Sequence, residues 1–255
     1  MVASPNTAAD RLHVALSKTF EGLFSAVDDA SFERRAGHVR LLFPSVPMRI
    51  FNGVLVESEP CSGVADSIRE VEERGLSCGL QLRVERHPRV EEEAARLGFT
   101  EQEPMPGMTV VPDELVDVRA PDLEIACADD EEALLEAARL AATVWGTRLE
   151  RVRPLFAPVI LEIPGMSVYV GRVEREAVTT AIGYRTDKEV ALFNVATLPK
   201  RRRQGYGAAI SAHAVRAGFE DGADLAWLQT SPMGEPVYRR LGFRHVEMHV
   251  LLHRR

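Results

Sequence analysis

The sequence has few cysteines, and their spacing excludes two kinds of cysteine-based stabilisation. Its 255 residues include only Cys61, Cys78 and Cys127, which lie far apart and never form a CxxC pair. An odd number of widely separated cysteines argues against a disulfide framework and gives no metal-ligand spacing. We therefore expect reduced thiols that are buried as small apolar side chains, and no metal site.

Long apolar runs and an excess of basic charge are also missing. No stretch approaches the roughly 20 apolar residues of a membrane span, and the first five residues lack a basic region followed by an apolar run. The formal net charge is -7, from 31 basic and 38 acidic residues. Nucleic-acid binding needs a broad basic face, whereas here only residues 200–203 form a local basic patch. These absences predict a cytoplasmic protein that binds neither a membrane nor nucleic acid.

The length and the overall composition indicate a globular protein with two domains. Hydrophobic residues make up 45% of the chain and charged residues 27%, which is ordinary for a globular protein, and 255 residues exceed the commonest domain size. Residues 111–122 contain two prolines and several acidic residues with little apolar periodicity, as expected of a connector. The sequence therefore predicts domains at residues 1–118 and 119–255.

The most informative feature is a glycine loop between an apolar strand and a helix. The strand-like stretch ends at Thr197, and Pro199 precedes the segment Arg202-Arg203-Gln204-Gly205-Tyr206-Gly207. An apolar stripe with helical spacing follows and ends before Gly222; it comprises Ala208, Ala212, Val215 and Phe219. Glycines allow the first N–H groups of a helix, which lack partners within the helix, to approach an anion closely. The pattern predicts a phosphate-binding loop.

Two better-known glycine loops do not fit this segment. A P-loop ends in Gly-Lys-Ser/Thr, which is absent here. The dinucleotide-binding pattern needs Gly or Ala at position 210, where the sequence has Ile210. Both alternatives are therefore excluded.

The elements around the loop follow a regular order. Residues 166–173, 177–184 and 189–197 have the pattern of three successive strands. Before them, Asp129 and Glu132 have the spacing of a helix N-cap, and a second helix is expected over residues 149–163. After the loop come Leu228-Gln229-Thr230-Ser231-Pro232 and then Tyr238-Arg239-Arg240-Leu241-Gly242-Phe243.

The R-x-x-G-x-G pattern after a strand containing Asn194-Val195-Ala196-Thr197, together with these two downstream segments, resembles the acyl-CoA-binding core of the GNAT acetyltransferase superfamily. The resemblance covers about the last half of the chain. It implies an α/β (α+β) fold with a mixed, mostly antiparallel central sheet flanked by helices. It also implies acetyl-CoA as the co-substrate.

The resemblance implies a role for particular residues. The pyrophosphate of acetyl-CoA is expected to bind at the glycine loop. The pantetheine arm of acetyl-CoA is expected to lie along the end of the strand and near Ser231. The implied cofactor-binding residues are Val195, Ala196, Thr197, Arg202, Arg203, Gln204, Gly205, Tyr206, Gly207, Ala208 and Ser231. The backbone N–H of Val195 is expected to stabilise the oxyanion of the thioester. Tyr238 is expected to protonate the departing thiolate, since a phenol stays protonated at neutral pH.

The base and the acceptor remain open at this stage. Many members of the superfamily use a carboxylate on the strand where this chain has Asn194, and Asp187, Glu189 and Glu235 are the alternatives. The acceptor is expected to be a small-molecule or peptide amine, and the protein a monomer or a homodimer. A non-catalytic acyl-CoA-binding or interaction protein is the alternative function.

The first half contains a fainter copy of the pattern in the second half. A helical stripe that ends at Gly75 precedes an expected strand over residues 78–84, and a short acidic helix closes in Leu97-Gly98-Phe99. Ala94 replaces the tyrosine, and Gly63 is the only glycine at the corresponding loop. The sequence predicts an internal duplication with a degenerate GNAT-like first half. The histidines at positions 213, 245, 249 and 253 are expected at the surface or at an interface.

Overall fold

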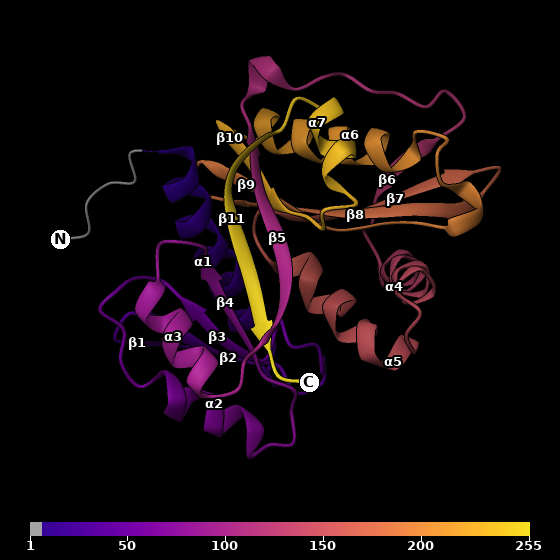
Figure 1. Cartoon of the computed structure of the whole chain (residues 1–255). Helices are drawn as coiled ribbons and strands as arrows, with labels where there is room; N and C mark the ends of the chain where they lie inside the picture. The colour runs from indigo at the N-terminus through magenta and orange to yellow at the C-terminus, as the bar shows by residue number, and fades with distance from the viewer. Residues whose placement is uncertain (1–6) are drawn as a thin grey trace. The chain divides into compact units, whose positions relative to one another are not determined.

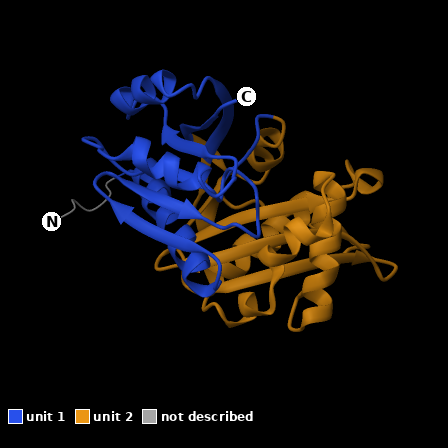
Figure 2. Ribbon diagram, turned by 90° about the horizontal axis from the view of Figure 1, so that it is seen from below, with its two compact units in different colours: residues 1–107, 229–232, 246–255 blue, residues 108–228, 233–245 orange. Residues whose placement is uncertain are grey.

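The computed structural model describes residues 7–255, which form two compact units (Figure 2). Unit 1 contains the chain up to Gly107 together with Gln229–Pro232 and Val246–Arg255, and unit 2 contains Met108–Leu228 and Met233–His245. The chain is therefore not divided by a single cut near residue 118. Residues 1–6, where the sequence lacks a basic region followed by an apolar run, lie outside the described residues.

Unit 1 is a mixed sheet with helices on both faces. Its strands follow the order β1-β2-β3-β4-β11-β5, and only β3 and β4 are parallel among the pairs whose registers are known. The strands are β1 (Ser31–Arg35), β2 (His38–Leu42), β3 (Gly53–Val56), β4 (Gly79–Arg83), β5 (Glu101–Val110) and β11 (Arg244–His253). The last two strands run from one unit into the other, and unit 1 takes the first part of β5 and the last part of β11.

The two faces of this sheet differ in chemistry. Leu80 and Leu82 on β4 pack with Val250 and Leu252 of β11 against α2 (Val64–Glu72) and α3 (Pro88–Arg96). The alternate residues of the same strands point to the opposite face, which α1 (Ala8–Ala26) covers in part. That face carries the polar residues Gln81, Arg83 and His249, all buried.

Unit 2 contains the predicted strand order and the predicted loop helix. Its sheet runs β5-β10-β9-β8-β7-β6, with β5 contributing its last three residues. The strands are β6 (Glu124–Cys127), β7 (Met166–Val173), β8 (Glu176–Thr186), β9 (Glu189–Thr197) and β10 (Leu225–Gln229). In Figure 1, α6 (Tyr206–Glu220) and α7 (Glu235–Arg240) lie on one side of this sheet, and α4 (Glu131–Trp145) and α5 (Leu149–Val152) on the other. The expected mixed, mostly antiparallel fold is confirmed.

Two local predictions in unit 2 need correction, and one strand was missed. The helix expected over residues 149–163 is divided into α5, η2 (Arg153–Phe156) and η3 (Pro158–Glu162), because prolines at positions 154 and 158 each start a new short turn. The N-cap of α4 is Asp130, whose Oδ1 accepts the N–H of Ala133 at 2.8 Å, and not Asp129. The edge strand β6 was not predicted. The connector contains only the short helix η1 (Pro112–Glu114) and is otherwise irregular, as expected.

The Leu-Gly-Phe repeat has the same local geometry in both units. Gly98 and Gly242 adopt left-handed φ angles of 85° and 94° after α3 and α7. The N–H of the following phenylalanine bonds to the carbonyl of Ala94 in unit 1 and of Tyr238 in unit 2. Both phenylalanines are buried. A side chain at Gly242 would collide with the Glu114 carbonyl, so this turn requires glycine.

The histidine and cysteine predictions were only partly correct. His249 is fully buried, with its ring centroid 5.8 Å from that of His13, and is therefore not a surface residue. Cys78 is buried as expected, whereas Cys127 is exposed and Cys61 is half-buried. All three are free thiols, and burial raises the pKa of Cys61 to about 11 and of Cys78 to about 12.

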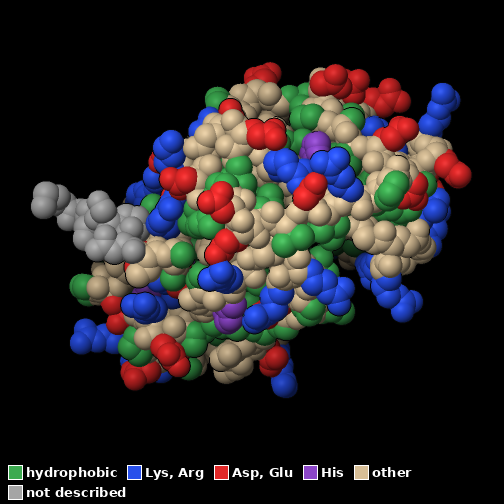
Figure 3. Space-filling view, turned by 90° about the horizontal axis from the view of Figure 1, so that it is seen from above, with side chains coloured by type: hydrophobic (Ala, Val, Ile, Leu, Met, Phe, Trp, Pro, Cys, Tyr) green, Lys and Arg blue, Asp and Glu red, His purple; other side chains and the backbone are tan. Residues whose placement is uncertain are grey.

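Three further features concern the surface charge, the length of the helices and the clustering of possible metal ligands. On the face drawn in Figure 3, acidic and basic side chains are interspersed, and neither sign covers a broad area. Within residues 7–255, none of the helices combines the length and apolar character needed to cross a bilayer. The same residues include no group of three or more acidic, histidine or cysteine side chains that could hold a metal ion.

Candidate active site

The parallel strands β9 and β10 pair at one end and then separate. Their register covers only Glu189–Ala191 on β9, opposite Leu225–Trp227 on β10. Beyond this point β10 turns toward β5, where the N–H of Thr230 bonds to the carbonyl of Pro106 at 3.1 Å. The edge of β9 from Leu192 to Thr197 therefore has no register partner in β10. An open strand edge presents backbone donors and acceptors to a peptide-like ligand.

A β-bulge lies in the middle of this open edge. The register between β8 and β9 shifts between Thr180 and Ile182, which pair with Ala196 and Phe193, so Asn194 and Val195 oppose a single residue. Asn194 has a left-handed φ of 52°, which is uncommon for a residue with a side chain. A bulge removes one residue from the ladder and turns its backbone groups outward. The strand is thus interrupted at the residue predicted to donate to the oxyanion.

The strand then leads into the glycine loop as expected. Gly205 is the N-cap of α6 with a φ of 87°, and no atom lies within 4 Å of the position that a Cβ there would take. At Gly207 a Cβ would lie 3.1 Å from the Oγ1 of Thr197, so glycine allows the helix to begin close to the strand end. The start of α6 therefore lies next to the end of β9, with open space on the Cβ side of Gly205.

The polar side chains around the loop hold it in place. The Nε of Arg202 donates to the Thr197 carbonyl at 3.3 Å, and the Gln204 amide donates to the Lys200 carbonyl at 3.4 Å. Arg202, Arg203 and Gln204 are exposed, so their side chains remain accessible to an anion. The hydroxyl of Tyr206 donates to Asp122 and its ring is buried, which leaves only the backbone of Tyr206 for a ligand. Gly207 and Ala208 form the first turn of the helix.

Tyr238 lies near this helix. It is half-buried on α7, and its ring packs edge-on against Phe243 at 5.9 Å between centroids. Burial raises the pKa of Tyr238 to about 12, and the hydroxyl of Ser211 on α6 lowers this pKa to a smaller extent. The Ser211 hydroxyl donates in turn to the Gly207 carbonyl at 2.7 Å. Tyr238 is therefore a protonated phenol at neutral pH, connected through Ser211 to the first turn of the loop helix.

Sequence reasoning missed Ser211 and Thr179. The hydroxyl of Thr179 lies 2.9 Å from that of Thr197 and donates to the Ala196 carbonyl at 3.0 Å, so it braces the end of β9 from β8. Ser211 follows Gly207 by one helical turn, and this spacing is the only signal that could have indicated it. Thr179 is brought to the site by strand pairing, which the sequence pattern does not specify.

Two of the three candidate bases lie at the wrong end of the strand. Asp187 and Glu189 are at the β8–β9 turn, and Val195 follows Glu189 by six residues of extended chain, which is roughly 20 Å. Glu235 begins α7, one turn before Tyr238, and forms an ion pair with Arg239 at 2.6 Å. Ser231 follows β10 and belongs to unit 1, where it lines a cavity.

The comparisons with known proteins agree with this geometry. Residues 164–245 match the model of the acetyltransferase (GNAT) domain. This segment contains β7, β8, β9, the glycine loop, α6, β10 and α7. This part of the chain is therefore identified as a GNAT acetyltransferase domain. Members of this superfamily transfer an acetyl group from acetyl-CoA to amines.

Solved structures resemble the chain over nearly its whole length. A GCN5-related N-acetyltransferase from Kribbella flavida is 22% identical, with a TM-score of 0.73 over 98% of this chain and 96% of that one. A functionally unknown protein from Staphylococcus epidermidis is 14% identical, with a TM-score of 0.66 over 93% and 98%. A GCN5-related N-acetyltransferase from Sphaerobacter thermophilus is 16% identical, with a TM-score of 0.58 over 78% and 71%. These similarities show the fold. A comparison with curated proteins finds no match.

Proposed function

We propose that the protein transfers an acetyl group from acetyl-CoA directly to a primary amine, with unit 2 as the catalytic domain. The observation that supports this most strongly is the open, bulged edge of β9 leading into the glycine-capped start of α6. A pantetheine arm contains two amides, which match an open strand edge, and a pyrophosphate matches the N–H groups of a helix N-terminus.

Each residue then has a defined role. The backbone of Val195, Ala196 and Thr197 binds the pantetheine arm. The N–H groups from Gly205 to Ala208 bind the pyrophosphate, with charge from Arg202 and Arg203 and a polar contact from Gln204. The bulge directs the Val195 N–H at the thioester carbonyl, where a donor of this kind contributes about 2.7–4 kcal/mol to the barrier reduction in other enzymes.

The amine nitrogen forms a bond to the acetyl carbon while the carbon–sulfur bond breaks. Tyr238 donates its phenolic proton to the thiolate that forms as the carbon–sulfur bond breaks. Its raised pKa keeps the phenol protonated at neutral pH before this step. The amine loses a proton to Glu235 or to a water held by it. Glu235 is the candidate carboxylate on the same helix as Tyr238.

Unit 1 is proposed to be a degenerate copy that lacks this site. Its β3, α2 and β4 repeat the arrangement of β9, α6 and β10, and Gly63 caps α2 with a left-handed φ of 80°. The register between β2 and β3 runs without a bulge, and the His38 ring lies 4.0 Å from the Cβ position at Gly63. Ala94 is buried at the position of Tyr238. Unit 1 therefore lacks a counterpart of the β9 bulge, of the open space at Gly205 and of the proposed acid Tyr238.

Calorimetry with coenzyme A and acetyl-CoA tests the proposal, followed by assay of thiol release with a panel of amines. Micromolar binding with amine-stimulated thioester loss is expected. Binding without transfer to any amine would instead indicate a non-catalytic acyl-CoA-binding protein. Absence of both binding and transfer in folded protein would disprove the proposed function.

Substitution of the loop glycine gives a sharper test of the phosphate site. Gly205→Ala places a methyl group in the open space before α6 and should weaken coenzyme A binding by roughly tenfold, the loss of one or two helix-terminus contacts. Gly222→Ala is the matched control, because Gly222 has a φ of 101° at the other end of α6 and also has open space around it. Both variants should lose about 1 kcal/mol of stability. Equal coenzyme A affinities in the two variants would contradict the phosphate site.

A further inference from the structure

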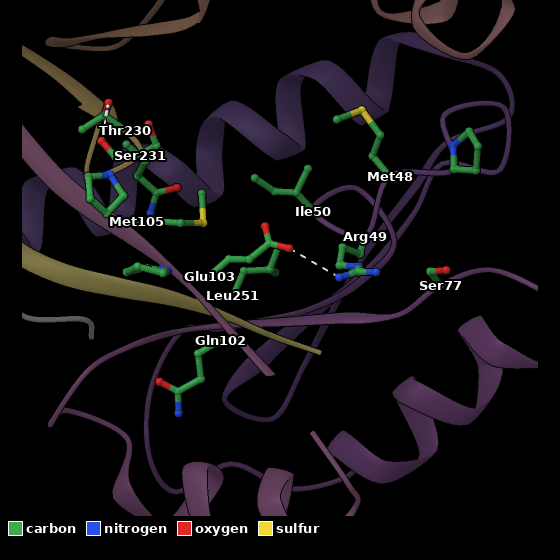
Figure 4. A pocket seen from close by; sticks show the side chains of 14 residues that line it. Met48, Arg49, Ile50, Ser77, Gln102, Glu103, Met105, Thr230, Ser231 and Leu251 are labelled. Carbon is green, nitrogen blue, oxygen red and sulfur yellow. Dashed lines mark hydrogen bonds and ion pairs between the residues drawn. The ribbon is translucent and has the colours of Figure 1, made fainter. Parts of the chain in front are cut away.

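Unit 1 contains an open cavity of about 730 Å³ on the polar face of its sheet (Figure 4). Its walls come from the loops before β3 and β4, from β5, from β11, and from the end of β10 with the segment that follows it. Half of the fourteen residues around it are apolar, among them Met48, Ile50, Met105, Leu251 and three prolines. In Figure 4, Met105, Thr230 and Ser231 gather at one end of the cavity and Met48 lies toward the other.

The charges in this cavity compensate one another. Arg49 and Glu103 are the charged residues of the wall, and their side chains face each other at 3.4 Å. His253 on β11 also contacts Glu103 at 3.2 Å. The cavity therefore has no unpaired carboxylate to attract a polycation, and its walls suit a mostly apolar molecule.

A pair of glutamines on the same face has unused hydrogen-bonding capacity. Gln81 pairs with Leu251 in the β4–β11 register, so its side chain lies on the face where Leu251 lines the cavity. Its Nε2 donates to the Oε1 of Gln229 at 2.8 Å. The Oε1 of Gln81 and the Nε2 of Gln229 are buried and have no partner within residues 7–255.

This pair offers one acceptor and one donor whichever way the two amides are assigned. If both amides are turned over, the roles exchange, and one donor and one acceptor still remain. A carboxamide is the complementary group, because it supplies both a carbonyl oxygen and an N–H. Leaving such atoms unpaired costs about 1–3 kcal/mol each, which a ligand that pairs with them offsets. Gln229 also lines the cavity, so a ligand there meets the pair at this residue.

We propose that this cavity binds a small ligand or peptide end that carries an apolar side chain and a carboxamide. The inference concerns unit 1 by itself and goes beyond the acetyl transfer proposed for unit 2. The apolar side chain occupies the space between Met105, Ile50 and Leu251, and the carboxamide pairs with Gln229. An apolar amino-acid amide and the first residue of an apolar peptide share this chemistry. Polyamines and aminoglycosides lack both features.

Calorimetry without any coenzyme tests the binding step. L-phenylalaninamide should bind the full chain, phenethylamine should bind more weakly because it lacks the amide, and spermidine should not bind at millimolar concentration. Phe-Gly-Gly tests the peptide source of the same chemistry: binding at least as tight as that of the amide indicates a peptide, and tighter binding of the amide a small molecule. Failure of both L-phenylalaninamide and Phe-Gly-Gly to bind would overturn the inference, and coenzyme A binding measured in parallel shows whether the proposed function still stands.

Two substitutions test the assigned contacts. Gln229→Leu should weaken the binding of L-phenylalaninamide by about 3- to 10-fold, because one hydrogen bond is lost. The affinity for phenethylamine should stay within about twofold. Gln102→Leu is the matched control, since Gln102 is exposed at the same cavity and its side chain points away from the others in Figure 4. Met105→Trp should fill the cavity and abolish binding of both amines, whereas Met233→Trp, at a position that is 86% exposed, should not.

Circular dichroism and thermal melting establish that each variant folds. If Gln229→Leu lowered the affinities for L-phenylalaninamide and phenethylamine equally, the glutamine would not recognise the amide. Unchanged binding in folded Met105→Trp would show that the amines bind elsewhere. Either result would overturn the inference.

Discussion

Tyr238→Phe should lower kcat by about 10²- to 10⁴-fold, the usual contribution of a positioned general acid, with little change in the affinity for acetyl-CoA. The substitution removes only the phenolic oxygen, and the ring still packs against Phe243. Because burial raises the pKa of Tyr238 to about 12, the acid form persists throughout the accessible pH range. Its titration should therefore produce no loss of rate on the alkaline side below about pH 11.

Tyr184→Phe provides the matched control for this prediction. Tyr184 lies on β8 of the same unit, is 6% exposed and also has a pKa raised by burial. The control substitution therefore removes the same phenolic oxygen at a position away from α6. Steady-state kinetics with acetyl-CoA and an active amine measure both variants. Similar kcat values for the two variants would show that Tyr238 is not the acid.

Acidification should destabilise unit 1 well before its carboxylates are protonated. His13 and His87 are 6% and 4% exposed, and burial lowers the pKa of His13 to about 3 and of His87 to about 4. Both histidines are neutral in the folded protein, whereas in the unfolded chain they bind protons below about pH 6.5. The free energy of unfolding should therefore fall as pH falls, by about 3 kcal/mol between about pH 6.5 and pH 5 for the two together.

The charged neighbours of these histidines act in both directions. Arg83 donates to Asp10 at 2.9 Å and to Glu247 at 2.5 Å, and Glu247 also contacts His249 at 2.8 Å. Arg83 and His249 lower the pKa of His13, whereas Glu247 and the Glu57 carbonyl raise it by a smaller amount than burial lowers it. The pKa values of Asp10 and Glu247 are lowered, so their contribution to stability is lost only at more acidic pH.

Urea unfolding followed over a range of pH measures this effect. His13→Gln retains a donor for the Glu57 carbonyl and does not titrate, so the slope of stability against pH should decrease by about 1.4 kcal/mol per pH unit between about pH 4 and pH 6. His245→Gln, at an exposed position, is the matched control. An unaltered slope in His13→Gln would mean that this histidine is already protonated in the folded state.

The glycine loop could be located from sequence because its determinants are local. The glycines at 205 and 207, the preceding strand over 189–197 and the helical stripe from Ala208 onward each require only near neighbours, and each is confirmed in position. The Leu-Gly-Phe turns were also recognisable in both halves, since a left-handed glycine after a short helix is set by local sterics.

The bulge at Asn194 and the separation of β9 from β10 were not apparent in the residues. Both depend on which strands pair and over what length, and pairing partners are chosen by packing across the whole sheet. The same holds for Ser211 beside Tyr238 and for Thr179 beside Thr197. These contacts join residues that are 27 and 18 positions apart in the chain.

Local sequence thus sufficed to indicate the fold class and to position the glycine loop between β9 and α6, because glycine conformations and apolar periodicity act over one or two turns of chain. Long-range packing was needed to bury His249, to place the glutamine pair on the polar face of unit 1 and to assign Ser231 to its cavity. A buried or an exposed position depends on the partner strand opposite each residue, and that partner lies up to about 170 residues away in the β4–β11 pair.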